Sequence, residues 1–178
     1  NDPNHLNLGI RYGYIEQLDD ELLRISKESF DALSFNCYAL SPDHEKMNHA
    51  LEISGLPMII GEYHFGTVDR GLAQSLWQVN SQKERGDAFR YYTENAFAPR
   101  GLIVTGWFRW IDQNINGRTD GENYNCGFID VTDRPYPYMV DAAIETAKSL
   151  YEIHSGTKTP FHQAPNAVGH SPIPNLWE

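Results

Sequence analysis

Four short apolar runs, each followed by a segment with helical periodicity, constrain the fold of this chain more than any other feature. The runs cover residues 6–11, 32–38, 58–64 and 102–108. The helical segments cover about residues 15–29, 43–53, 82–97 and 136–153. Repeated alternation of strand and helix predicts a parallel sheet with right-handed crossovers. The fold class is therefore α/β, and 178 residues fit one domain or a piece of a larger one.

Alternation within the first two runs separates an apolar face from a polar one. In the first run, the residues that share the apolar face are Leu6, Leu8 and Ile10. In the second run, Leu33, Phe35 and Cys37 oppose Ser34, Asn36 and Tyr38. A barrel packs its outer strand face on helices and turns polar inside near its mouth, whereas an open doubly wound sheet is apolar on both faces. The pattern therefore favours a (β/α)8 TIM barrel.

The third run delivers a single carboxylate, Glu62, at its far end. The parity of this run puts Met58, Ile60, Glu62 and His64 on the inner face. Ligands of parallel α/β proteins bind at the carboxyl ends of strands, and a carboxylate is costly to bury there unless it is hydrogen-bonded or has a function. Glu62 is therefore either a structural ion-pair partner or a functional group.

Four strand–helix units make only half of an eightfold barrel. Either another chain supplies the other half, or the architecture is an open sheet. Residues 157–178 contain Pro160, Pro165, Pro172 and Pro174, and we expect an extended tail draped over the surface. The opening residues Asn1, Asp2 and Pro3 resemble a loop within a longer protein.

Composition narrows the possible partners. The formal charge of −10 argues against nucleic acid and anionic membrane surfaces, and no apolar run is long enough to span a bilayer. Acidic, aromatic-rich chains are common among sugar-processing proteins. The two cysteines, Cys37 and Cys126, fit one disulfide or two free thiols equally well.

The remaining polar groupings predict no metal and no cofactor. The seven histidines lack zinc-ligand spacing. Residues 112–117 imitate the start of a calcium loop but follow a strand, which favours a sugar-binding loop instead. The charged residues of the third helical segment fit a solvated face with pairs one turn apart; they are Glu84, Arg85, Asp87 and Arg90.

Several short motifs lie along residues 1–155. They occupy residues 2–6, 34–38, 60–66, 69–71, 106–108, 111–113, 120–125, 127–128 and 131–133. The words Ile-Gly-Glu-Tyr-His-Phe-Gly and Asp-Gly-Glu-Asn-Tyr-Asn are the most specific. Together they resemble the C-terminal half of the catalytic barrel of the β-agarases of glycoside hydrolase family 50. The resemblance implies that residues 1–156 are the C-terminal half of a (β/α)8 TIM barrel, strands 5–8, completed by sequence or a chain beyond this one. It also implies a retaining glycoside hydrolase that acts on β-linked galactan of agarose type.

The same resemblance implies roles at the strand ends. Glu62 is then the nucleophile, and Tyr38 is the expected donor of a hydrogen bond to it. His64 is expected to orient Glu62 or to bind a sugar hydroxyl, and Asn36 is expected to contact substrate. The stacking platform for a sugar ring is Trp107, for which packing in the core is the alternative.

The loop that follows the fourth strand is expected to line the sugar subsites. Its candidate substrate-binding residues are Asp112, Glu122 and Asn123. Arg118 lies in the same loop, where a plain surface role competes with substrate contact.

One required group is not found in the sequence. A retaining enzyme needs a second carboxylate about 5 Å from the nucleophile. Family 50 belongs to a large clan that includes many β-galactosidases, and in that clan the second carboxylate comes from an Asn-Glu pair at the end of strand 4. No such pair occurs here on a strand-like run, so the acid/base is expected from an N-terminal half-barrel, as a second or nicked chain. The alternatives are a β-galactosidase-like hydrolase of the same clan and a non-catalytic carbohydrate-binding half-barrel fragment. The polymeric substrate implies an extracellular or periplasmic location.

Overall fold

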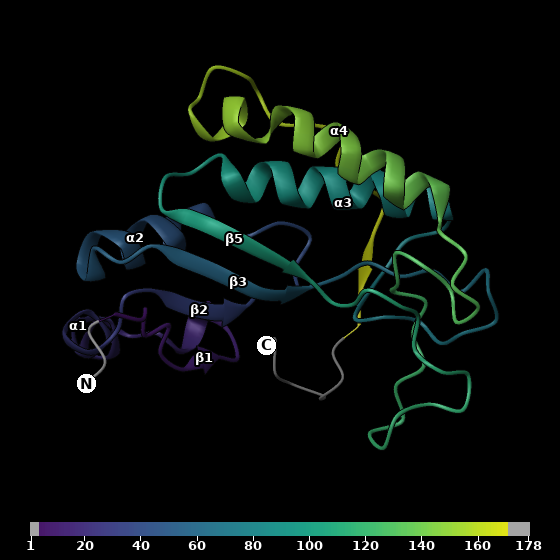
Figure 1. Ribbon diagram of the computed structural model, residues 1–178, viewed down its shortest axis with the longest axis horizontal. Coiled ribbons are helices and arrows are strands. Elements are labelled where there is room, and N and C mark those ends of the chain that lie inside the picture. Colours follow the sequence, from purple (N-terminus) through teal and green to yellow (C-terminus); the bar gives the residue numbers. More distant parts are fainter. Residues whose placement is uncertain (1–3, 171–178) are drawn as a thin grey trace.

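Parallel strands form the central element of the computed structural model, which describes residues 4–170. The strands β1 (Arg11–Tyr12), β2 (Leu33–Asn36), β3 (Met58–Tyr63) and β5 (Leu102–Trp107) form one sheet in the order β1-β2-β3-β5 (Figure 1). All three neighbouring pairs are parallel. The predicted parallel α/β fold is therefore confirmed.

A helix follows each strand of this sheet. The helices are α1 (Asp20–Ser29), preceded by the 3-10 turn η1 (Ile15–Gln17), α2 (His44–Ser54), α3 (Gln82–Phe97) and α4 (Pro137–His154). Local capping fixes where they begin. The side chains of Asp19, Asp43 and Ser81 accept hydrogen bonds from the first-turn amides of α1, α2 and α3, and Pro137 stands in the first turn of α4.

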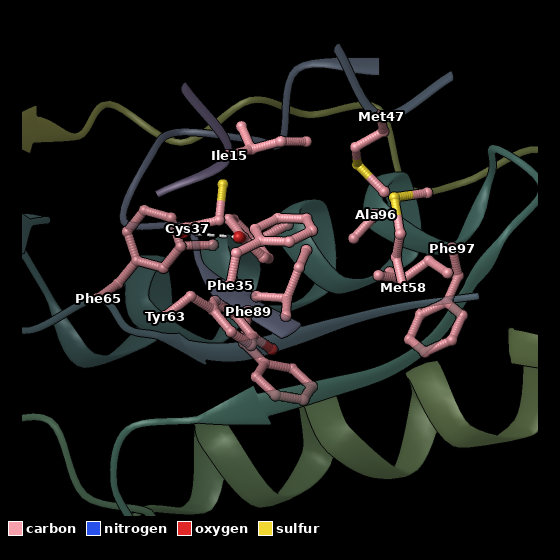
Figure 2. Close-up of a cluster of buried hydrophobic side chains, with 14 of the residues drawn as sticks. Ile15, Phe35, Cys37, Met47, Met58, Tyr63, Phe65, Phe89, Ala96 and Phe97 are labelled. Carbon is pink, nitrogen blue, oxygen red and sulfur yellow. Dashed lines mark hydrogen bonds between the residues drawn. The ribbon is translucent and has the colours of Figure 1, made fainter. Parts of the chain in front are cut away.

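One face of the sheet carries the hydrophobic core. Phe35, Met58 and Ile60 are fully buried there, together with Phe89 and Tyr92 of α3. Figure 2 shows Phe35, Met58 and Phe89 within this cluster. Strands in consecutive order with right-handed crossovers put every helix on the same face. The opposite face has no helix of the described chain on it, and Val104 is 45% exposed.

The prediction of a first strand over residues 6–11 was wrong for residues 6–10. Only Arg11 and Tyr12 join the sheet, and the three apolar side chains that were expected to share a buried face are exposed, namely Leu6, Leu8 and Ile10. The cause is a local turn. The side chain of Asn7 accepts from the Gly9 amide, and Gly9 has a φ of +70°.

The predicted parity of β3 was also wrong, because β3 contains a bulge. Phe35 pairs with Ile60, but the next residue, Asn36, pairs with Glu62, so that Gly61 is an additional residue. Met58 and Ile60 consequently pack in the core on the helix-covered face, whereas Glu62 turns to the open face beside Asn36.

The chain after α4 runs back across α3. The Phe161 amide donates to Glu94, a buried carboxylate of α3, at 2.8 Å. Farther on, β6 (Val168–Gly169) pairs antiparallel with β4 (Trp77–Gln78), which lies in the connection from β3 to α3. Residues 171–178 of the expected tail lie outside the described residues. Among residues 4–170, no helix combines the length and the apolar character needed to cross a bilayer.

Candidate active site

Glu62 lies near the carboxyl end of β3 with its side chain 20% exposed, and three neighbouring side chains donate to it. Tyr38 Oη donates to Glu62 Oε2 at 2.8 Å, and Asn36 Nδ2 donates to the same oxygen at 3.2 Å. Arg11 Nη1 forms an ion pair with Oε1. All three donors come from the adjacent strands β1 and β2 or the residues just after them, so the sheet itself assembles the site.

Tyr38 is the hydrogen-bond donor that the sequence predicted for Glu62. Burial, together with the hydrogen bond and the charge of Glu62, raises the pKa of Tyr38 far above its ordinary range. The phenol therefore stays neutral and keeps its proton for the carboxylate. Arg11 was missed as a site residue, although its place on the polar face at the end of the first run was a usable signal.

Two glycines allow the bulge that presents Glu62. A Cβ atom on Gly106 of β5 would lie 2.5 Å from the carbonyl oxygen of Gly61. A Cβ on Gly61 would lie 3.0 Å from the Arg11 side chain. The close approach of β3 to β5 at this point therefore requires glycine.

His64 is buried, with 1% of its surface exposed, and both ring nitrogens bind backbone groups. Nδ1 lies 3.0 Å from the carbonyl oxygen of Phe108, and Nε2 accepts from the Leu76 amide at 3.1 Å. Burial lowers the pKa of His64 to about 3, against a smaller opposing effect of the Phe108 carbonyl. Neither nitrogen is open to a sugar hydroxyl in this arrangement, and no direct bond joins His64 to Glu62 among the described contacts.

Trp107 packs against the core on the helix-covered face, which is the alternative that the sequence analysis left open. It pairs with Tyr63 across β3 and β5, and its ring makes edge contacts with Tyr63, Phe89 and Phe128 at centroid distances of 5.2, 5.6 and 5.8 Å. Its Nε1 donates to the Cys126 carbonyl at 2.7 Å. Trp107 shares the helix-covered face with Tyr63, whereas the bulge at Gly61 turns Glu62 to the open face. Trp107 is a packing residue of the helix side.

Asp112 is buried, and its carboxylate holds the loop after β5 from within. It accepts from the Gly127 amide at 2.7 Å, Asn125 Nδ2 at 2.8 Å and Tyr136 Oη at 2.6 Å. These bonds engage both oxygens and give Asp112 a structural role, and its contact with substrate stays a prediction. Among residues 4–170, no cluster of three or more His, Cys, Asp or Glu could hold a metal ion.

Arg85 was predicted on a solvated face, and that prediction was wrong. Its side chain is fully buried, donates to the Asn125 carbonyl at 2.8 Å and lies over the Tyr136 ring at 4.4 Å. Burial lowers the pKa of Arg85. The reason is the loop after β5, which folds back over α3 and covers this side chain.

Glu122 and Asn123 lie in the polar loop, as the sequence analysis expected. Glu122 accepts from Gln113 Nε2 at 2.8 Å and forms an ion pair with Arg118 at 3.2 Å. Asn123 Oδ1 accepts from the Ala73 amide at 3.2 Å. Glu122 also lines a surface groove with Ala73, Gln74, Asp120, Gly121, Tyr124 and His170. Their contact with substrate stays a prediction.

The two cysteines are buried free thiols, which settles the alternative that the sequence left open. Burial raises the pKa of Cys37 to about 11 and that of Cys126 to about 12. Neither is poised as a nucleophile.

Comparison with known proteins gives no match to a family model. Two curated proteins, β-agarase A and β-agarase B of Vibrio sp. (strain JT0107), are 36% and 34% identical over 156 residues. The crystal structure of an agarase, AgWH50C, superimposes with a TM-score of 0.79 at 37% identity over 85% of this chain. The structure of an exo-β-agarase gives 0.79 at 36% identity over 88%. The chain is β-agarase-like.

The agarase-like chain spans only part of these relatives. The matched region is 84% of this chain but only 16% of each curated β-agarase. In the two solved structures, the matched region is 22% and 21% of the respective chain. The match confirms the resemblance to glycoside hydrolase family 50 that the short motifs indicated.

Proposed function

We propose that this chain carries the nucleophile of a retaining glycoside hydrolase and that the enzyme acts on β-linked galactan of agarose type. The observation that supports the proposal is Glu62 at the carboxyl end of β3, held by donors from Arg11, Asn36 and Tyr38. Proteins that are similar to this chain over most of its length are named agarases. A fixed, partly exposed carboxylate at this edge of a parallel sheet is suited to attack on a sugar.

The proposed reaction proceeds in two displacements. An oxygen of Glu62 attacks the anomeric carbon, the bond to the leaving sugar breaks, and an acid protonates the departing oxygen. Water then attacks the same carbon, the acid residue takes up the proton as a base, and Glu62 is released with net retention. Tyr38 and Asn36 hold one carboxylate oxygen, so that the reacting oxygen keeps a fixed direction toward the sugar.

The second carboxylate, the acid/base, is proposed to come from a half-barrel that lies outside this chain. Consecutive parallel strands with helices on one face support a half (β/α)8 barrel. Apolar side chains are exposed near both of its edges, on β5 and α4 at one end and before β1 and on α1 at the other. They are Ile103, Val104, Ile144, Tyr151, Leu8, Ile10 and Ile25.

These exposed side chains are where the missing strands and helices would pack. The partner is then an N-terminal half-barrel, in the same polypeptide or in a second or nicked chain. An agarose-type polymer is too large to enter a cell intact, so the proposed site of action is extracellular or periplasmic.

The substitution Glu62→Gln in the complete protein tests the proposal. Turnover of agarose oligosaccharides is expected to fall by several orders of magnitude, because the amide cannot form the covalent intermediate, while binding of the oligosaccharide is retained. The matched control is Glu16→Gln, which removes another ion-paired glutamate, bonded to Lys46 at 2.9 Å and half exposed. The control is expected to keep turnover. Near-normal turnover in Glu62→Gln would contradict the assignment.

A further inference from the structure

The imidazole of His64 joins more parts of the site than any other side chain described around Glu62. Its Nδ1 bonds to the carbonyl of Phe108, the residue after β5. Its Nε2 accepts from the amide of Leu76, which lies in the connection between β3 and α3. The carbonyl of Leu76 in turn accepts from the His170 amide at 2.7 Å. The ring also contacts Tyr38 and Tyr124 edge-on, at centroid distances of 5.0 and 5.7 Å.

The hydrogen bonds of His64 determine its tautomer. A backbone carbonyl can only accept, so Nδ1 carries the proton that bonds to Phe108. A backbone amide can only donate, so Nε2 is the unprotonated nitrogen that receives the Leu76 amide. A protonated ring would lose the second bond, and a ring of the other tautomer would lose both. Only the neutral Nδ1–H form satisfies the site.

We propose that His64 is a positioning residue that holds the Tyr38 hydroxyl against Glu62. The proposal rests on the proposed role of Glu62 as nucleophile. His64 makes no hydrogen bond to the carboxylate among the described contacts. Its ring packs edge-on against the ring of Tyr38, and Tyr38 Oη lies 2.8 Å from Glu62 Oε2. Because its two backbone bonds fix the ring, His64 transmits the positions of the β3–α3 connection and the β5 end to the tyrosine.

This role distinguishes His64 from a histidine that only stabilises the fold. His154, at the end of α4, also bonds a backbone carbonyl through Nδ1, that of Phe97 at 3.0 Å, and also makes an edge contact with a ring. Its partner in both contacts is Phe97 of α3, which is not one of the groups around Glu62. His154→Asn is therefore a matched control for His64→Asn.

The test is a double-mutant cycle in the complete protein with Tyr38→Phe. His64→Asn alone is expected to lower kcat by about 10- to 100-fold with little change in KM, since displacement of a positioned group by about 1 Å can cost about 100-fold. Adding His64→Asn to Tyr38→Phe is expected to change kcat by less than about threefold. His154→Asn is expected to leave kcat unchanged. Effects of His64→Asn and Tyr38→Phe that multiply would overturn the proposal, because His64 would then act independently of Tyr38.

A second measurement does not depend on turnover. Nitrogen-15 spectra of the His64 ring in the unsubstituted protein are expected to show the Nδ1–H tautomer, and hydrogen exchange of the Leu76 amide is expected to accelerate in His64→Asn. The Nε2–H tautomer, or an unchanged exchange rate, would overturn the proposal even if Glu62 is the nucleophile. Conversely, Glu62→Gln could keep turnover while the nitrogen-15 spectra and the hydrogen-exchange rates agree with the structure. The proposed function then fails, and the geometry of the His64 site stands.

Discussion

The buried neutral ring of His64 should make the protein sensitive to acid. Lowering the pH is the perturbation, and the ring is the group that responds. In the folded state, burial holds the pKa of His64 at about 3, whereas the ordinary value is 6.5. Between these values the unfolded chain binds a proton at this position and the folded chain does not. The ring therefore contributes stability fully above pH 6.5 and loses it as the pH falls.

The size of the effect follows from the same two values. Each pH unit below 6.5 removes about 1.4 kcal/mol from the free energy of unfolding. The loss reaches about 3 kcal/mol at pH 4.5 and about 5 kcal/mol near pH 3. Carboxylates titrate over part of this range as well, so the total pH dependence is not diagnostic. The difference between the unsubstituted protein and His64→Asn isolates the ring.

Urea unfolding followed by tryptophan fluorescence, from pH 7.5 to pH 4.5, measures this difference. His64→Asn is expected to be less stable at pH 7.5, because the Phe108 carbonyl and the Leu76 amide lose their hydrogen bonds to the ring. On acidification the gap between the two proteins should narrow by about 3 kcal/mol by pH 4.5. A constant difference in the free energy of unfolding between the two proteins would refute the argument. It would mean that His64 binds a proton as readily in the folded state as in the unfolded state.

Two further substitutions test the corrections to the sequence-based account. Trp107→Ala should lower the free energy of unfolding by about 3 kcal/mol, because the ring packs against the core; a loss of oligosaccharide binding with full stability in urea would contradict its placement. Gly106→Ala should cost about 1–3 kcal/mol and reduce turnover, since the new Cβ meets the Gly61 carbonyl and displaces the bulge before Glu62. Unchanged thermal unfolding and turnover in Gly106→Ala would show that the bulge tolerates a side chain.

Local signals in the sequence were enough to predict most of the fold. The α3 and α4 segments were located to within one residue because helical periodicity acts over a few residues. The false strand at residues 6–10 had a local warning, since Asn7 and Gly9 are turn-forming residues. The alternation of apolar residues there was coincidental.

The site was predictable where it depends on the sheet and unpredictable where it depends on loops. Tyr38 and Glu62 meet because neighbouring parallel strands end together, and this was foreseen. The bulge at Gly61 was not, and it puts Glu62 on the opposite face from Ile60 and Trp107. The burial of Asp112 was also missed, because it depends on how the loop after β5 folds back over α3, far away in sequence.

The central claim, that Glu62 is the nucleophile of a retaining hydrolase, is tested most directly by trapping the intermediate. The complete protein would be treated with a 2-deoxy-2-fluoro-β-galactoside that carries a good leaving group, digested, and its peptides weighed by mass spectrometry. The account predicts one added fluorosugar on the peptide that contains Glu62, and none in Glu62→Gln. A fluorosugar on a different carboxylate would contradict it.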